Sequence, residues 1–403
     1  MKKWLSLLVI CMICCFSFQN VNATDHIELY SRYAYLIDPQ THIVYIDQNS
    51  NEQIYPASMT KIMTVALALE KIDDLQTIVM IESTDLEGLY EMGASVAGFA
   101  VKEKVTYEDL LYGSLLPSGA DACNALARLT YGSQEAFVKA MNLKTEELGL
   151  KNTHFSNTTG LHEDDHYTTV QEMSQILEWA LENPRFKTIF ETRRYTSSSN
   201  NHTWSSTLAR AQSSTQLDTT ILDGAKSGFT DEAQLTLAST MTIDNHQLIL
   251  VTAYAQGQRS SNNVKDALHV YEEMKNNYHN ITLYYKGDEI CQYYILKTTD
   301  MPYHYIAQED ISLLVDHNIS MTDLEVKIQG NKLQVAPLKN KSEIGHIDIS
   351  YQNQQLMSYS LNLYEDIEVN QTLMFIFDSI IVCLIVFVIS KIMISKRKNH
   401  NHS

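Results

Sequence analysis

Two residues near the start of a short apolar segment could generate a nucleophile. Ser58 and Lys61 are three positions apart, so in a helix their side chains lie on one face. Pro56, just ahead, suits a helix start, and the largely apolar run 62–69 would continue the helix. A neutral lysine amine beside an alcohol can accept its proton. The spacing therefore predicts a serine nucleophile, Ser58, with Lys61 as its base.

Two later fragments could complete such a site. Ser118 follows the helix breaker Pro117, where a serine can project into a cleft, although alone it is more often a helix N-cap. The fragment Lys226-Ser227-Gly228 ends a strand-like run, and a glycine in a strand lets another backbone or a ligand approach closely. A single Ser-x-x-Lys is a weak signal, because residues 395–398 repeat it by chance. Three fragments in this order are much stronger.

Both ends of the chain carry membrane-targeting signals. Lys2 and Lys3 precede an apolar run and a small-residue cleavage site ending at Ala23, which predicts a secretory signal peptide. An uncleaved N-terminal membrane helix is the alternative. Near the C-terminus, residues 372–394 are long and apolar enough to cross a bilayer, and the basic tail after them predicts a cytoplasmic end. Asp378 is expected near the outer headgroups. The body is therefore expected outside the cell, tethered by its tail.

The composition limits the class of partner. The formal net charge is -18, and an acidic surface argues against nucleic acid as a ligand. His154, His162 and His166 lie near three acidic residues, but their spacing matches no metal-ligand set. We therefore expect no metal and no cofactor.

The pattern of the body predicts an α+β domain followed by an all-β domain. Strands are expected at 33–38, 42–47, 219–228, 234–242 and 247–255, with helices between them and a helix from Asn262 to Met274. Residues 196–216, rich in serine and threonine, are expected to form an exposed loop. After about residue 281, short alternating runs predict a small β-sandwich. The expected organisation is a signal peptide (1–23), a catalytic domain (24–277), a β-sandwich domain (278–365), a linker (366–371), a transmembrane anchor (372–394) and a cytoplasmic tail (395–403).

The three fragments and their surroundings resemble the low-molecular-mass penicillin-binding proteins of the D-alanyl-D-alanine carboxypeptidase family. The resemblance covers most of the exported body and its β tail. It is carried by Pro56–Thr64, Asp109–Gly119, Thr153-His154-Phe155, Gly160-Leu161, His166–Thr169, Ala336-Pro337-Leu338 and Glu343-Ile344-Gly345. It implies a penicillin-binding/β-lactamase-like domain, with an antiparallel sheet covered by helices on both faces and a helical subdomain.

The resemblance also implies roles for the candidate residues. Ser58 would attack the bond between two terminal D-alanines of a peptidoglycan stem peptide, and Lys61 would take its proton. Ser118 would pass a proton to the leaving D-alanine. Lys226 and Ser227 would hold the substrate carboxylate, and the backbone N–H groups of Ser58 and Phe229, next to Gly228, would form the oxyanion hole. β-Lactam antibiotics would be covalent inhibitors.

Two departures from the family pattern concern substrate binding. The second motif is usually Ser-x-Asn, but the third position here is Ala120, and Asn124 one helical turn later is a possible substitute. The family also tends to place an arginine after the last central strand. Arg259 is nearby, but Asn263 stands at the position that corresponds to this arginine.

Three functions remain open from the sequence. The first is an active carboxypeptidase, whose balance with endopeptidase action is undecided. The second is a weakly active or inactive wall-binding or regulatory homologue, which Ala120 motivates. The third is a β-lactamase, but the loop around Glu163 lacks the Glu-x-x-x-Asn spacing of the class A enzymes, and a β tail domain is foreign to them.

Overall fold

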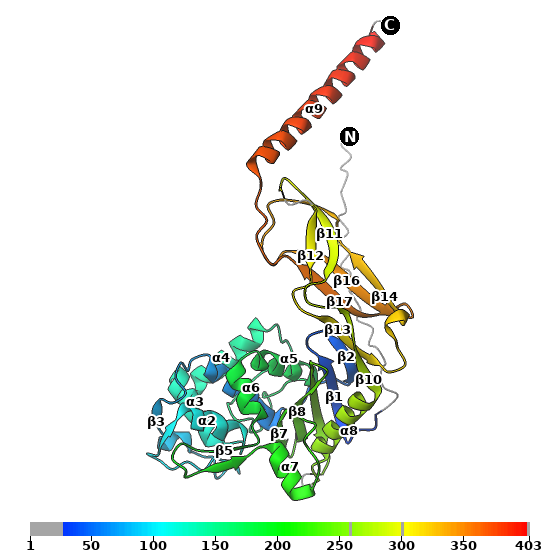
Figure 1. The fold of residues 1–403 in the computed structure, drawn as a ribbon. Helices are drawn as coiled ribbons and strands as arrows, with labels where there is room; N and C mark the ends of the chain where they lie inside the picture. Colours follow the sequence, from blue (N-terminus) through cyan, green and yellow to red (C-terminus); the bar gives the residue numbers. More distant parts are fainter. Residues whose placement is uncertain (1–26, 258–259, 300–301, 401–403) are drawn as a thin grey trace, which may run out of the picture.

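A five-stranded antiparallel sheet forms the centre of the N-terminal half of the molecule (Figure 1). The computed structural model describes residues 27–257, 260–299 and 302–400, so the predicted signal peptide and Arg259 lie outside the described residues. The strand order is β2-β1-β9-β8-β7, which leaves β7 at one edge. The strands are β1 (Ser31–Asp38), β2 (Ile43–Gln48), β7 (Gly224–Thr230), β8 (Gln234–Ile243) and β9 (His246–Ala255).

Local turn chemistry explains the strand boundaries. Asp244 and Asn245 join β8 to β9 with φ angles of 46° and 72°, the left-handed values that a two-residue hairpin requires. The predicted strand 219–228 is wrong at its start. Leu222 N–H donates to Thr219 O in a turn, and the strand begins only at Gly224.

Helices cover both faces of this sheet. On one face α8 (Asn262–Asn277) packs against β1, β8 and β9. On the other face α5 (Val170–Leu181) contacts the same strands, and α1 (Thr60–Leu69), buried along its whole length, packs against α5. The predicted antiparallel sheet with helices on both faces is confirmed.

The remaining helices of this half form a subdomain beside the β7 edge of the sheet (Figure 1). They pack around α1, so one core contains both the subdomain and a face of the sheet. The elements are η1 (Ala57–Met59), β3 (Ile78–Met80), η2 (Ser83–Asp85), β4 (Lys104–Thr106), α2 (Tyr107–Leu115), α3 (Ala120–Tyr131), α4 (Gln134–Glu147) and α6 (Pro184–Glu191).

The segment predicted as a loop at 196–216 is partly ordered as regular structure. A short hairpin, β5 (Arg194–Thr196) and β6 (Thr203–Ser205), is followed by α7 (Thr207–Thr215). Ser206 caps this helix, because its side chain accepts from the Ala209 N–H. Leu208 and Ala211 are buried, and the helix packs against β7. The expectation failed because serine and threonine dominate the segment, while only two apolar residues mark the packed face.

A β-rich domain follows α8 and shares a hydrophobic core with the sheet. Tyr45 and Leu248 of the sheet belong to the same cluster as Leu313 and Ile347. The strands form three small sheets, ordered β10-β13, β12-β11-β15 and β14-β16-β17. The elements are β10 (Tyr278–Tyr284), β11 (Glu289–Leu296), β12 (Tyr303–Ile306), β13 (Ile311–Asp316), η3 (Met321–Asp323), β14 (Leu324–Gln329), β15 (Leu333–Val335), β16 (Glu343–Tyr351) and β17 (Gln354–Asn362).

The chain ends in a long apolar helix, α9 (Gln371–His400), which projects away from the β-rich domain (Figure 1). Its segment Gln371–Met393 has 23 residues and a mean hydropathy of 2.8. That length and composition are sufficient to cross a bilayer.

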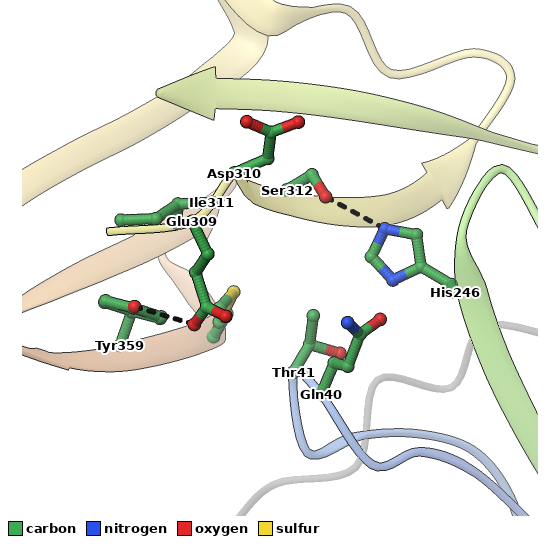
Figure 2. Close-up of a pocket in the computed structure, with 9 residues that line it drawn as sticks. Gln40, Thr41, His246, Glu309, Asp310, Ile311, Ser312 and Tyr359 are labelled. Atoms are coloured by element: carbon green, nitrogen blue, oxygen red, sulfur yellow. Dashed lines mark hydrogen bonds between the residues drawn. The ribbon is translucent and has the colours of Figure 1, made fainter. Parts of the chain in front are cut away.

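A cavity lies where the first sheet meets the β-rich domain (Figure 2). His246 and Thr41 line it from the sheet, and Ser312, Glu309 and Tyr359 line it from the β-rich domain. In Figure 2 the imidazole of His246 reaches the Ser312 hydroxyl, at 3.0 Å. This contact ties the two parts of the molecule together.

Candidate active site

Ser58 lies in η1, the tight turn that leads into α1. The residue before it, Ala57, has a φ of 46°, a strained value for alanine. Gly160 packs against this turn, and a Cβ at that position would overlap the Ala57 carbonyl. Only glycine fits there, because its φ of 80° is also left-handed. The turn that presents Ser58 is therefore held from outside by the loop containing Gly160.

Lys61 is in hydrogen-bond contact with the predicted nucleophile. Its Nζ donates to Ser58 Oγ at 2.9 Å and to the carbonyl of Thr159 at 2.5 Å. The side chain is buried, and burial lowers the pKa of the Lys61 amine. A lowered pKa increases the neutral fraction of the amine, which is the form that can accept the serine proton.

A second serine–lysine pair faces the first. Lys226 of β7 donates through Nζ to Ser118 Oγ at 3.0 Å and to the Ser227 carbonyl at 2.7 Å. Ser118 lies between α2 and α3 with a φ of 66°. Burial lowers the pKa of Lys226, and the positive charges of Lys61 and Arg210 lower it further. Lys61 is therefore close enough to affect the protonation of Lys226.

The edge strand β7 lies directly against the Ser58 turn. A Cβ at Gly228 would lie 2.6 Å from the Ser58 backbone nitrogen and 2.8 Å from Ala57 Cβ. No larger residue fits without moving the backbone. Because β7 is an edge strand, some of its N–H groups have no partner within the sheet. Phe229 is the next residue of β7, and the oxyanion hole formed by its N–H and that of Ser58 stays a prediction.

The structure adds a cation that sequence reasoning missed. Arg210, on α7, donates to the carbonyls of Leu116 and Ser205, at 2.6 and 2.5 Å. Its neighbour Thr207 exchanges a hydrogen bond with Ser227 Oγ at 2.9 Å. Arg210 is thus a fixed positive charge near Lys226. Nothing in the sequence indicated it, because it lies in the segment expected to be a loop.

A histidine also supports the nucleophile turn. The Ser156 N–H donates to His166 Nδ1 at 3.0 Å, so the proton of the neutral ring is on Nε2. His166 Nε2 lies 2.7 Å from Thr60 Oγ1, which donates to the Ala57 carbonyl at 2.8 Å. Burial is the main cause that lowers the pKa of His166 to about 4. The neutral ring therefore completes a directed chain of hydrogen bonds to the residue before Ser58.

The suggested substitute for the amide missing at Ala120, Asn124, is buried and hydrogen-bonded within the protein. Its Nδ2 donates to Asp85 O, and its Oδ1 accepts from Thr158 Oγ1. Asn263, which stands where the family has arginine, is also buried, and its Nδ2 donates to the Thr236 carbonyl.

The three histidines considered from the sequence form no metal site among the described residues. His154 contacts the Asp165 carbonyl, His162 packs edge-on against Tyr55, and His166 belongs to the chain above. No group of three or more potential ligands converges in the part of the chain that the structure describes.

A serine, a histidine and an aspartate are hydrogen-bonded in series beside the cavity that His246 and Ser312 line. Asp38 Oδ2 is 2.7 Å from His246 Nδ1, and Ser312 Oγ is 3.0 Å from Nε2. Asn280 Oδ1 also lies 3.2 Å from Nε2. Burial is the largest single effect and lowers the pKa of His246, but the hydrogen bond and charge of Asp38, together with Asn280 and Asp244, outweigh it and the pKa is raised. These contacts connect β1 and β9 of the sheet to β10 and β13 of the β-rich domain.

Fold and site together define a penicillin-binding/β-lactamase-like protein with a β-rich C-terminal domain. Residues 19–257 match the family described as D-alanyl-D-alanine carboxypeptidase, and residues 278–369 match the C-terminal domain of penicillin-binding protein 5. The first match covers more than half of the chain. The chain therefore belongs to the D-alanyl-D-alanine carboxypeptidase family, and the predicted resemblance and fold class are confirmed.

Individual relatives agree with this assignment. The chain is 28% identical over 379 residues to D-alanyl-D-alanine carboxypeptidase DacF of Bacillus subtilis. The match covers 91% of this chain and 95% of that protein. It is 31% identical over 237 residues to DacA of Escherichia coli, 55% of each chain. Penicillin-binding protein 5 of Haemophilus influenzae has the same fold, with a TM-score of 0.73 at 22% identity over 86% of this chain and all of that one.

Proposed function

We propose that this protein is a serine-type D-alanyl-D-alanine carboxypeptidase that removes the terminal D-alanine from peptidoglycan stem peptides. The observation that carries the proposal is the contact between Lys61 Nζ and Ser58 Oγ at 2.9 Å, with the lysine buried and its pKa lowered. Family membership supports the substrate class.

The first half of the reaction forms an acyl-enzyme. Ser58 Oγ attacks the carbonyl carbon of the penultimate D-alanine while its proton moves to Lys61. The oxyanion accepts hydrogen bonds from the backbone N–H groups of Ser58 and Phe229. The C–N bond then breaks, and Ser118 delivers a proton to the nitrogen of the departing D-alanine. The proton that Lys61 took from Ser58 replaces it on Ser118, so the Lys61 amine is neutral again before the ester is hydrolysed. Lys226, in contact with Ser118 at 3.0 Å, holds that hydroxyl in place.

The second half hydrolyses the ester. A water molecule, deprotonated by Lys61, attacks the acyl carbon, and Ser58 leaves with its proton restored. A β-lactam would acylate Ser58 in the same way, through opening of its four-membered ring.

The terminal carboxylate of the substrate is the feature that distinguishes a carboxypeptidase substrate from an internal peptide. Lys226, Ser227 and Arg210 gather donors and positive charge at one end of the site. A bound carboxylate favours protonated Lys226, and so offsets the burial that lowers its pKa.

Product analysis tests this proposal. The full-length protein in detergent is incubated with a defined stem pentapeptide, and D-alanine and tetrapeptide are quantified. Release of one D-alanine per peptide, abolished in Lys61→Met, is the expected result. Absence of release from protein with a cooperative thermal transition would contradict the proposal. A second incubation with a cross-linked dimer measures endopeptidase action.

A wall-binding or regulatory role with little turnover is the second candidate. It is favoured by Ala120, which removes the amide that relatives use for the acyl side of the substrate, and by the occupied amide of Asn124. Robust release of D-alanine by the wild-type protein would exclude it.

The proposed location is the outer face of the cytoplasmic membrane. The support is the apolar segment Gln371–Met393 and the basic residues Lys396, Arg397 and Lys398 after it, which favour a cytoplasmic tail.

A further inference from the structure

The C-terminal helix is attached to the β-rich domain at the end of β11. The Asn370 N–H, just before α9, donates to the Lys297 carbonyl at 2.7 Å. Lys297 Nζ lies 3.3 Å from Asp378 Oδ1 and 5.4 Å from the centre of the Phe377 ring. These contacts hold the first turns of α9 against the residue that follows β11, and Figure 1 shows α9 leaving from this end of the domain.

The Lys297–Asp378 pair constrains the depth of the helix in a bilayer. The apolar segment Gln371–Met393 is about 34 Å long as a helix, and Asp378 lies about 10 Å from its start. The helix beyond Asp378 to Met393 is therefore shorter than the hydrocarbon core of about 30 Å. A carboxylate is costly in hydrocarbon, and pairing with Lys297 reduces that cost. If α9 crosses the bilayer, the Lys297–Asp378 pair therefore lies at the boundary between the headgroups and the hydrocarbon.

An exposed apolar face lies on the strands beside Lys297. β11 and β15 are parallel neighbours in which Tyr294 pairs with Leu333 and Leu296 with Val335. Because side chains alternate along a strand, these four residues share one face. We call this set the β11–β15 face. Tyr294, Leu333 and Val335 are 53%, 50% and 49% exposed.

This face is continuous with the point of attachment of the helix. Leu296 immediately precedes Lys297, and its carbonyl accepts from the Ala336 N–H at 3.0 Å. The chain after Ala336 then bridges to the linker, where Leu338 and Ile367 exchange backbone hydrogen bonds. Adjacent exposed apolar side chains form a candidate contact surface for an apolar medium. The nearest apolar medium is the bilayer that α9 would cross.

The charges around the face favour an apolar contact over an electrostatic one. Tyrosine is enriched at membrane interfaces, because its ring is apolar and its hydroxyl is wet. Lys332 is exposed next to Leu333, but the linker carries Asp366 and Glu368, both near Lys339. The basic and acidic groups offset each other, so anionic lipid should add little.

We propose that the β11–β15 face rests in the headgroup region of the same bilayer that α9 crosses, with the Lys297–Asp378 pair setting its depth. This inference rests on the proposed membrane anchoring and is independent of the peptidase activity. The contact holds one edge of the β-rich domain against the lipid surface. The Ser58 site lies at the other end of the molecule.

Depth-dependent fluorescence quenching tests this contact. Full-length protein is reconstituted into phosphatidylcholine vesicles with bromine near the headgroup end of the acyl chains, and a tryptophan is added as Leu333→Trp. The matched control is Met321→Trp, because Met321 is 54% exposed and precedes the start of β14, at the end of the domain away from α9. Val386→Trp reports insertion of the helix itself. The parent spectrum is subtracted throughout.

We expect strong quenching and a blue shift at positions 333 and 386, with neither at 321, and no change at high salt. Quenching at 386 without quenching at 333 would overturn the contact while leaving the anchor intact. No quenching at 386 would refute the anchor, and the proposed contact with it. Quenching at 333 only with anionic lipid and low salt would overturn the apolar character of the contact. Thermal unfolding of each variant, expected within a few degrees of the parent, checks the fold.

Discussion

Lys226 Nζ donates to Ser118 Oγ at 3.0 Å, although the two residues are separated by 108 positions in the chain. The contact joins the edge strand β7 to the helical subdomain. A lysine that donates to Ser118 leaves that hydroxyl free to donate onward. In the proposed mechanism Ser118 therefore protonates the leaving amine.

Replacing Ser118 by alanine tests that role. We expect Ser118→Ala to slow acylation by a labelled penicillin about 100-fold, the usual contribution of a positioned proton donor. Ser114→Ala is the matched control, because Ser114 is also buried but its hydroxyl donates to the Leu110 carbonyl of its own helix. Equal rates in Ser118→Ala and the wild type would remove Ser118 from the mechanism.

The protonation of Lys61 should control the pH dependence of acylation. Burial lowers the pKa of this amine, so the rate rises as pH rises through the lowered value. The negative charge of Asp121 raises the pKa of Lys61, so Asp121→Asn should lower that pKa further and move the acidic limb to lower pH. Acylation rates from about pH 5 to about pH 10 measure the limb. Lys71→Met, at an exposed position, should leave it unchanged. An unmoved limb in Asp121→Asn would contradict the coupling.

His166 should act as a positioning residue for Ser58. His166→Ala breaks the chain from Ser156 through Thr60 to Ala57, and we expect acylation to fall about tenfold, consistent with loss of about one hydrogen bond to the turn. His166→Gln can both accept and donate, so it should restore most of the rate.

The ring of His166 also predicts a pH effect. Its pKa is lowered from 6.5 to about 4, so the folded state binds this proton less tightly than the unfolded chain. The neutral ring therefore favours the folded state above pH 6.5, and this contribution is lost as pH falls through 4. Wild-type stability should decline over that window, and His166→Gln should decline less. Identical profiles for the two proteins would argue against a neutral, buried ring.

Restoring the family asparagine at position 120 tests whether the missing amide weakens substrate binding. Ala120→Asn should raise kcat/KM for a stem pentapeptide about tenfold, equivalent to about 1.4 kcal/mol and within the range of one hydrogen bond. Penicillin acylation should change less, since Ser58, Lys61, Ser118 and Lys226 are untouched. Because Ala120 is buried, the thermal midpoint must be measured as well. Unchanged kcat/KM in a stable variant would show that the missing amide is not limiting.

Local spacing was sufficient to predict the Ser58–Lys61 pair, because three positions in a helix place two side chains on one face. The pairing of Ser118 with Lys226 could be reached only through the family resemblance, since no local rule joins residues so far apart. Arg210 was missed because the helix that carries it is short and rich in serine and threonine. Chemical roles for all of these residues stay predictions.

The large elements were easier to predict than the contacts between them. Alternating apolar patterns and the Asp244-Asn245 turn located β8 and β9, whereas the strand expected from 219 began only at Gly224, after a turn. No role beside Ser58 was predicted for His166, because its partners Thr60 and Ser156 are close in space but not identifiable from sequence. The mutual spacing of side chains from different elements is a property of packing, which a single sequence does not reveal.

Covalent labelling of Ser58 by penicillin tests the central claim most directly. The full-length protein is incubated with a penicillin, and the intact mass and the labelled peptide are determined. We predict one adduct per chain on Ser58, none in Ser58→Ala, and a strongly slowed reaction in Lys61→Met. No adduct on folded wild-type protein, or an equal adduct on Ser58→Ala, would contradict the account.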